Sequence, residues 1–343
     1  MPPMLIKPVK PCVALIFVLA AGCRKTEERG FVYVSNEDSG TLSVIDAGAN
    51  EVVATIEVGK RPRGVRMGRD GKRVYVALSG SPKCPPWMKD EECEAQVTDK
   101  SLDGIAAVDV AAHRVVEVLP GGSDPETFDL SLDGKRLYVS NEDADVASIV
   151  DVETRQVVKT VPVGREPEGV RTSPDGRYVY VTGETDHDVT VIETSSGEVV
   201  AKIPVGNRPR DAAFTGDGKR AFVSSEIDGT VSVIDVSAHK VVATIELPEG
   251  ARSMGVAVSS DDRRLFVSNG RSKTVSVVDL ETLAVTGEVE VGERPWGIAL
   301  SRDGRLLYTA NGPSNDVSVV DTATLRVLTR IPVGEAPWGI AVW

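Results

Sequence analysis

The stretch Val291 to Asp321, VGERPWGIALSRDGRLLYTANGPSNDVSVVD, contains a pattern that recurs along nearly the whole chain. As a consensus, the unit is VGxxPxGVAxSxDG, a basic residue, a hydrophobic run ending in asparagine, a polar loop, TVSVID and, after a short turn, VVxTI. Each segment is rich in Val, Ile, Tyr and Thr and is bounded by Gly, Pro, Asp or Asn, which is the composition of a β-strand. The sequence therefore predicts an all-β repeat protein.

A tight turn recurs in one column of the repeat. Asp-Gly pairs suit such a turn because glycine adopts a positive φ at no steric cost. The column is occupied at Asp70, Asp133, Asp175, Asp217, Asp261 and Asp303. Successive spacings are 63, 42, 42, 44 and 42 residues, so one repeat carries an insertion of about 21 residues. The asparagines that end the hydrophobic run are interpreted as turn residues as well: Asn36, Asn141, Asn269 and Asn311.

The period identifies the architecture. Four short strands in about 40–45 residues are typical of one blade of a β-propeller, which stacks on its neighbours around a ring. Seven copies of the second and third strands begin near Phe31, Val74, Leu137, Tyr178, Ala221, Leu265 and Leu306. We therefore predict a seven-bladed β-propeller of four-stranded blades over residues 31–343. Trp338 to Trp343 should join the blade that Phe31 begins and so close the ring.

The N-terminal segment does not contain the repeat. Val13 to Ala21 is an apolar run that is too short to span a bilayer, and it is typical of a cleaved signal. The following LAAGC, ending at Cys23, resembles a bacterial lipobox. This resemblance implies a lipoprotein signal peptide over 1–22, a lipidated Cys23 and a tether over 23–30. The chain would then be anchored by its lipid to a bacterial membrane, in the periplasm or cell envelope; ordinary signal cleavage without a lipid is the alternative.

Composition is that of an exported globular protein. The chain has 39 basic and 51 acidic residues, 32 Gly and 20 Pro, which supply the turns of many short strands. The formal net charge of −12 argues against binding to nucleic acid or anionic lipid headgroups and permits a cationic partner. No composition shift marks a second domain. We expect a monomer that contacts a membrane only through its N-terminal lipid.

The insertion covers residues 81–101, SPKCPPWMKDEECEAQVTDKS. It contains Cys84 and Cys93, nine residues apart in one polar loop. In an oxidising periplasm two such thiols are expected to pair, and we predict a disulfide that closes a small loop. Attachment of a metal or haem would require more ligands, because the insertion has no CxxCH motif and no histidine.

The repeats resemble a known family. Tyr33-Val34-Ser35-Asn36, Tyr138-Val139-Ser140-Asn141 and Thr309-Ala310-Asn311, with the VSVID strands, are similar to the YVTN family of β-propeller repeats. More narrowly, YVSNEDSGTLSVID, SDPETFDLSLDGKRLYVSNED and NGPSNDVSVVD resemble the propeller proteins encoded near pyrroloquinoline-quinone-dependent (quinoprotein) alcohol catabolism. The similarity covers residues 31–343 apart from the insertion. It implies an exported seven-bladed propeller associated with a periplasmic oxidation system, and it does not imply that this chain binds the quinone.

Candidate binding residues follow from the repeat. The loop that enters the innermost strand of a blade faces the mouth of the central channel, so the middle residue of PxG should occur seven times around that mouth. These residues are Arg63, Glu126, Glu168, Arg210, Met254, Trp296 and Trp338. A second ring adds Glu37, Glu142, Glu184 and Glu226. A polar rim with one aromatic wall suits a small ligand or a partner's protruding loop.

We expect the ligand to meet Trp296 and Trp338 with an apolar face, and Arg63 or Arg210 with an anionic group. The alternative is that arginines and glutamates of neighbouring blades pair with each other and that the tryptophans only cover the channel.

An enzyme would need a nucleophile, a base or a metal. The three histidines, His113, His187 and His239, are not spaced as metal ligands, and no Ser-His-Asp constellation is legible. Glu126 and Glu168 could act as acid and base or hold a cation, yet Arg63 and Arg210 are available as counter-ions. We therefore predict a non-catalytic binding protein without cofactor or metal. The alternatives are a lactonase-like hydrolase or haem d1-type redox propeller, and a structural protein of the cell envelope.

Replacement of Cys23 tests the lipobox prediction. Cys23→Ser removes the thiol that would receive the lipid, so it should abolish metabolic labelling with palmitate and yield a soluble or unprocessed chain. Cell fractionation in high salt measures the release, with Cys12→Ser as the matched control. Equal membrane retention of the Cys23 variant would contradict lipid anchoring.

Overall fold

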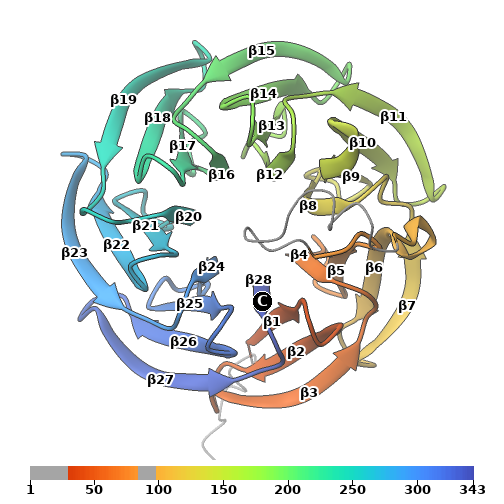
Figure 1. Cartoon of the computed structure of the whole chain (residues 1–343), viewed down its shortest axis with the longest axis horizontal. Coiled ribbons are helices and arrows are strands. Elements are labelled where there is room, and N and C mark those ends of the chain that lie inside the picture. The colour runs from red at the N-terminus through yellow and green to blue at the C-terminus, as the bar shows by residue number, and fades with distance from the viewer. Residues whose placement is uncertain (1–29, 84–97) are drawn as a thin grey trace, which may run out of the picture.

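The computed structural model describes residues 30–83 and 98–343. The predicted signal peptide, the lipidation site Cys23, and Cys84 and Cys93 lie outside the described residues. Within them, seven four-stranded antiparallel sheets form the blades of a ring (Figure 1). The predicted seven-bladed β-propeller is confirmed. Among the described residues, no helix is long and apolar enough to cross a membrane.

Each blade has an inner, a second, a third and an outer strand. The inner strands are β4 (Pro62–Met67), β8 (Pro125–Leu130), β12 (Pro167–Thr172), β16 (Pro209–Phe214), β20 (Ser253–Val258), β24 (Pro295–Leu300) and β28 (Pro337–Val342). The second strands are β1 (Phe31–Asn36), β5 (Arg73–Leu78), β9 (Arg136–Asn141), β13 (Tyr178–Gly183), β17 (Arg220–Ser225), β21 (Arg264–Asn269) and β25 (Leu306–Asn311). The third strands are β2 (Thr41–Asp46), β6 (Gly104–Asp109), β10 (Val146–Asp151), β14 (Asp188–Glu193), β18 (Thr230–Asp235), β22 (Thr274–Asp279) and β26 (Asp316–Asp321). The outer strands are β3 (Glu51–Glu57), β7 (Arg114–Leu119), β11 (Gln156–Pro162), β15 (Glu198–Pro204), β19 (Lys240–Glu246), β23 (Ala284–Glu290) and β27 (Arg326–Pro332). Two single 3₁₀ turns complete the described elements, η1 (Lys100–Leu102) and η2 (Glu142–Ala144).

The C-terminal strand completes the first blade, as predicted. The sheet order is β28-β1-β2-β3, and Val34 of β1 lies opposite Ile340 of β28 (Figure 1). The backbone N–H of Phe31 donates to the carbonyl of Trp343 at 3.1 Å, and the N–H of Trp343 donates back at 2.9 Å. The two ends of the propeller are therefore held together by one antiparallel strand pair.

The core lies between the blades. Aliphatic and aromatic side chains of neighbouring sheets form seven clusters of buried residues. Their largest members are fully buried tyrosines of the second strands, such as Tyr33 and Tyr138. The predicted Asp-Gly turns are also present, with φ of 68° at Gly71 and 69° at Gly304. Because one blade cannot bury both of its faces alone, the ring is the unit that folds.

Glycine at the third position of the inner strand allows neighbouring blades to touch. A Cβ on Gly169 would lie 2.4 Å from the carbonyl oxygen of Arg210 in the next blade, and one on Gly339 would lie 2.3 Å from the carbonyl oxygen of Arg63. Real Cβ atoms do not approach oxygen so closely. Thr127 replaces this glycine in β8, and its hydroxyl instead donates to the carbonyl of Glu168 at 2.5 Å. The glycine of PxG therefore sets the spacing of the inner ring.

The serine or threonine of the YVSN-like strand joins one blade to the next. The hydroxyl of Ser35 donates to the carbonyl of Arg63 at 2.6 Å, and that of Ser268 donates to the carbonyl of Trp296 at 3.0 Å. The same bond recurs from Ser140 to Glu168, Thr182 to Arg210 and Ser224 to Met254. These bonds hold the backbone of five candidate rim residues in place.

The asparagine that ends this strand begins the following turn, since the N–H of Gly40 donates to the carbonyl of Asn36 at 3.0 Å, and the asparagine side chain has a further role. Asn36 is fully buried, and its Nδ2 donates to the hydroxyl of Ser43 in the next strand at 2.9 Å. Asn269 and Ser276 make the same contact at 2.8 Å. The asparagine therefore cross-links two strands inside a blade, because a buried amide needs a hydrogen-bond partner.

Removal of the closing strand should open the ring. Deletion of residues 337–343 exposes the unpaired backbone of β1 and the apolar side chains that β28 covers. We expect the free energy of unfolding to fall by more than about 4 kcal/mol, far beyond the effect of an ordinary surface change. Urea unfolding measures the loss, and deletion of the predicted tether residues 24–29 is the control. An unchanged midpoint would contradict this closure.

Candidate functional site

The seven candidate rim residues occupy equivalent places, since each is the second residue of an inner strand. The four charged ones lie on four successive blades and are buried: Arg63, Glu126, Glu168 and Arg210. Met254, Trp296 and Trp338 lie on the remaining three blades. Five of the seven line one cavity of about 70 Å³ in the channel: Glu168, Arg210, Met254, Trp296 and Trp338. The structure therefore divides the mouth into a charged half and an aromatic half.

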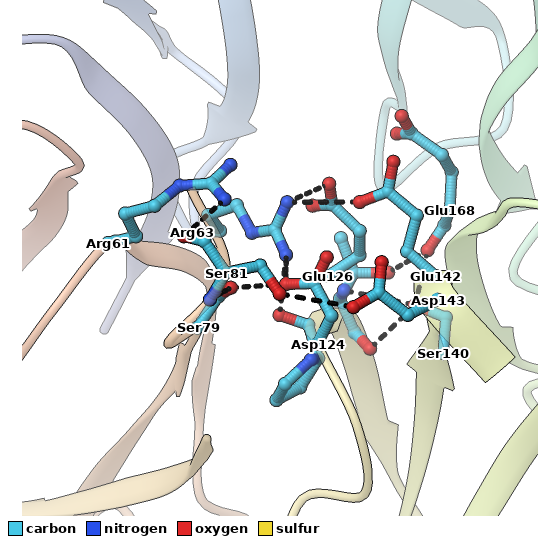
Figure 2. Close-up of polar contacts among 12 residues, drawn as sticks. Arg61, Arg63, Ser79, Ser81, Asp124, Glu126, Ser140, Glu142, Asp143 and Glu168 are labelled. Atoms are coloured by element: carbon cyan, nitrogen blue, oxygen red, sulfur yellow. Dashed lines mark hydrogen bonds and ion pairs between the residues drawn. The ribbon is translucent and has the colours of Figure 1, made fainter. Parts of the chain in front are cut away.

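Arg63 is surrounded by carboxylates (Figure 2). Its Nη2 lies 2.6 Å from Asp124, and its Nη1 pairs with Glu126 of the neighbouring inner strand and lies 3.2 Å from Glu142. The hydroxyl of Ser79 also donates to Asp124. One buried guanidinium thus faces three carboxylates from the next blade.

Arg210 repeats this arrangement on the other side of the two glutamates. Its Nη1 pairs with Glu168 and lies 2.5 Å from Glu184, and its Nη2 lies 2.7 Å from Glu226. Arg208 pairs with Glu184 as well. The four charged rim residues therefore run Arg, Glu, Glu, Arg around the mouth, with each arginine paired to the glutamate beside it.

The two central glutamates hold their protons unusually well. Burial raises the pKa of Glu126 well above its usual range, and Glu142 and Glu168 raise it further against the opposing effect of Arg63. Burial likewise raises the pKa of Glu168, where Glu184 and Glu142 add to it and Arg210 opposes it. Several carboxylates that share one buried arginine repel each other, and burial disfavours their charged form, so both effects raise the pKa of the central pair.

The pKa of Asp124 is shifted in the opposite direction from that of Glu126. Burial alone would raise its pKa, but Arg63 and the hydrogen bond from Ser79 bring the pKa below its usual range. Repeat analysis missed Asp124 because it precedes the PxG-like triplet. The available signal was the position directly before each PxG-like triplet. Arg61 and Arg208 occupy this position in other blades, and Asp124 is the one aspartate there.

The aromatic half consists of a stacked pair. The rings of Trp296 and Trp338 have centroids 5.4 Å apart and an interplanar angle of 25°. The guanidinium carbons of Arg210 and Arg294 lie 5.3 and 5.1 Å from the centre of the Trp296 ring. Cation–π contacts of this kind hold the ring in one orientation. Both tryptophans remain partly exposed, so they present a fixed apolar surface to the mouth.

The pairing alternative raised by the sequence is realised, and it changes the expected ligand. Because three carboxylates surround each of Arg63 and Arg210, neither guanidinium is available to an anionic ligand group. Around the rim, carboxylates instead outnumber the two arginines that they surround. Glu37 of the second ring is separate, since it pairs with Arg61 at 3.0 Å and Lys83 at 3.0 Å.

Classical catalytic groups do not join the rim. Within residues 30–83 and 98–343, no group of three or more His, Cys, Asp or Glu side chains could hold a metal ion. Nδ1 of His187 lies 3.0 Å from the carbonyl oxygen of Glu184, and the ring of His239 packs edge-on against Tyr178. The site is therefore a set of carboxylates, guanidiniums and aromatic rings.

Family models match parts of the chain. A model of the seven-bladed β-propeller lactonases matches residues 194–335. A YNCE-like β-propeller model matches residues 89–174 and 139–215. Antigen Lp49 of Leptospira interrogans is 31% identical over 141 residues, which are 33% of this chain and 31% of that protein. The chain therefore matches less than a third of the length of this curated relative.

Solved structures share the fold over most of the chain. Hydrazine synthase of Kuenenia stuttgartiensis has a TM-score of 0.70 at 20% identity, over 81% of this chain and 88% of that chain. A candidate 6-phosphogluconolactonase of Bacteroides uniformis has a TM-score of 0.75 at 17% identity, over 92% of this chain and 100% of that chain. At these identities the likeness shows the propeller fold alone.

Replacement of Arg63 tests the charge arrangement. Arg63→Met leaves three carboxylates without their shared counter-ion, which should cost about 3–5 kcal/mol of unfolding free energy at neutral pH. Because protonation relieves buried carboxylates, the loss should grow as the pH rises from about 5 to about 8. Urea unfolding at both pH values measures it. The control is Arg305→Met, whose side chain is 82% exposed and should matter little. A loss that is equal at both pH values would contradict the assignment.

Proposed function

We propose that this propeller is a non-catalytic binding protein, and that its rim-side mouth receives a group carrying both a positive charge and an apolar stem. The observation that carries the proposal is the division of seven equivalent positions into buried acid–arginine pairs and a stacked tryptophan pair. The fold needs neither feature at these positions. An aromatic surface beside surplus carboxylates is the chemistry that recognises an organic cation.

The two central glutamates supply the charge. One carboxyl oxygen of Glu126, Oε2, is buried and has no hydrogen-bond partner among the described residues. A cation that enters here can replace the protons that Glu126 and Glu168 retain, so binding and proton release are coupled. Trp296 and Trp338 lie across the same mouth and would cover the apolar stem.

The size of the cavity favours a protruding group over a whole small molecule. Its volume of about 70 Å³ is well below the roughly 300–1,000 Å³ of ordinary small-molecule sites. The tip of a lysine-like side chain fits at the rim end of this space, beside Glu168, whereas Arg66 and Arg171 line its inner end. We therefore infer that the ligand is a loop or side chain of a partner protein, in keeping with the acidic net charge of −12.

We also propose where the protein works. The lipobox-like LAAGC supports a lipid-anchored protein of the periplasm or cell envelope. Resemblance of its repeats to propeller proteins of quinoprotein alcohol catabolism supports an accessory role in a periplasmic oxidation system. The partner in this proposal is a component of that system with an exposed basic side chain.

A hydrolase of the lactonase type is the second candidate. The lactonase model over residues 194–335 supports it, and Glu168, with its raised pKa, is the available acid. Hydrolysis of δ-valerolactone by the purified protein, lost in Glu168→Gln, would favour this candidate over simple binding.

Titration with n-butylammonium tests the binding proposal. Proton and cation compete for Glu126 and Glu168, so affinity should increase as the pH rises through the raised pKa values of these two glutamates, which lie well above the ordinary glutamate range. The double variant Glu126→Gln, Glu168→Gln should weaken binding at least about tenfold and remove the pH dependence. The variant Trp296→Ala, Trp338→Ala should also weaken it and leave the far-ultraviolet circular dichroism β-like. Calorimetry measures the affinity of the wild type and of both double variants.

Two controls accompany this titration. Glu51→Gln removes an exposed carboxylate of an outer strand and should leave the affinity unchanged, and neutral n-butanol should bind far more weakly than the cation. Equal affinities of the wild type and both double variants would show that the tryptophans and glutamates only pack the channel.

A further inference from the structure

A second departure from the repeat lies deeper in the channel. At the fifth residue of the inner strand, four blades have alanine: Ala213, Ala257, Ala299 and Ala341. The other three blades are consecutive and carry Arg66, Asp129 and Arg171. The next blade adds Asp211, which replaces the glycine of the third position. We call these four charged residues the waist cluster. Because alanine at the fifth position is sufficient for the fold in four blades, the charged residues in the other blades need another explanation.

Arg171 is fully matched within the waist cluster. Its Nη2 lies 3.0 Å from Oδ1 of Asp211, and its Nε donates to the carbonyl of Ala212 at 2.8 Å. Asp211 accepts the backbone N–H of Ala212 as well. The carboxylate of Asp211 therefore matches the charge of Arg171.

Arg66 is not matched. Its nearest carboxylate is Asp129 at 4.0 Å, and one Nη donates to the carbonyl of Val65 at 3.0 Å. Its Nε is buried without a hydrogen-bond partner among the described residues. The oxygens of Asp129 already accept the backbone N–H groups of Leu130 and Thr172 at 2.8 Å each. The Arg66 side chain is 20% exposed, but its buried Nε is an unused donor, which is costly unless a ligand satisfies it.

The net charge around the waist is positive. Asp129 also lies 3.9 Å from Arg69, so three arginines, Arg66, Arg69 and Arg171, face the two aspartates. Burial and the charge of Arg171 lower the pKa of Arg66 to about 10, against the opposing effect of Asp129 and Asp211. Arg66 therefore remains charged at neutral pH, and one positive charge lacks a counter-ion.

A cavity of about 440 Å³ extends from the waist toward the other mouth. Arg66 and Arg171 line both this cavity and the smaller one below the rim, so they lie where the two cavities meet. The remaining wall is largely aliphatic: Val256, Val258, Ile298, Leu300, Ile340 and Val342. Its volume is within the range of small-molecule sites. The charged side chains of Arg66 and Arg171 therefore lie at the inner end of the cavity, and its apolar wall extends from them toward the other mouth.

We propose that this lower cavity binds a monoanion with an apolar body, a medium-chain monocarboxylate, whose carboxylate meets Arg66 and whose chain lies along the aliphatic wall. One carboxylate supplies the missing counter-charge and accepts from the unused Nε. This site does not include the seven rim residues, it opens toward the other mouth of the channel, and its ligand is negatively charged. It therefore does not rest on the proposed binding of a cation.

Calorimetric titration with octanoate tests this inference. The wild type should bind octanoate saturably, and Arg66→Gln should weaken binding at least about tenfold because the counter-charge is lost. Arg66→Lys keeps the charge and should retain most of the affinity. Arg326→Gln, at an exposed arginine of an outer strand, is the matched control and should be unaffected.

Two further measurements keep the test decisive. Thermal unfolding of each variant separates loss of the site from loss of the fold, and the comparison of the lysine and glutamine variants remains valid if both are less stable. Neutral 1-octanol should bind more weakly than octanoate. Absence of saturable octanoate binding at millimolar concentrations, or equal affinity of the wild type and Arg66→Gln, would overturn the proposal.

Discussion

The close approach of neighbouring inner strands is the constraint on which the rest of the structure depends. Glycine at the third position removes the Cβ that would otherwise meet the next blade's carbonyl, as at Gly169 and Gly339. The same carbonyls accept hydroxyl groups from the YVSN-like strands, as from Ser35. Where glycine occupies this position, the inner strands of neighbouring blades approach through backbone atoms. The packing of seven apolar clusters then follows from this spacing.

Freedom remains only at positions that face the channel. The second and fifth residues of the inner strands line the channel cavities, and there the repeat diverges. The inner strands β4, β8, β12 and β16 carry charged residues both at the rim and in the waist cluster. The inner strands β20, β24 and β28 instead carry Met, Trp and Trp at the rim and alanine at the fifth position. The channel therefore has a polar side and an apolar side along its axis. Its rim has more carboxylates than arginines, and its waist has more arginines than carboxylates.

The repeat pattern predicts which residues occupy equivalent positions in the seven blades, but it does not predict which of their side chains pair. The seven residues of the PxG column are each the second residue of an inner strand, and five of them line one cavity; the C-terminal strand was correctly assigned to the first blade. The repeat pattern did not identify Asp124 as the third carboxylate of Arg63, because that residue precedes the triplet. It also predicted the turn at Asn36 but not the burial of the Asn36 side chain between strands. The waist cluster escaped notice because Arg66 and Arg171 lie among strand residues that look like ordinary alternation.

The sequence by itself determined the number of blades, the strand order and the closure of the ring, because turn chemistry and alternation are local and repeat every 42 to 44 residues outside the insertion. Only the tertiary structure decided which charges are matched. Glu126 lies 63 residues from Arg63 along the chain, yet the two side chains pair across neighbouring blades. The raised pKa of Glu126, the pairing of Arg63 with three carboxylates and the unused donor of Arg66 depend on burial and on distances between blades. No local pattern encodes such distances, since they arise when the ring closes.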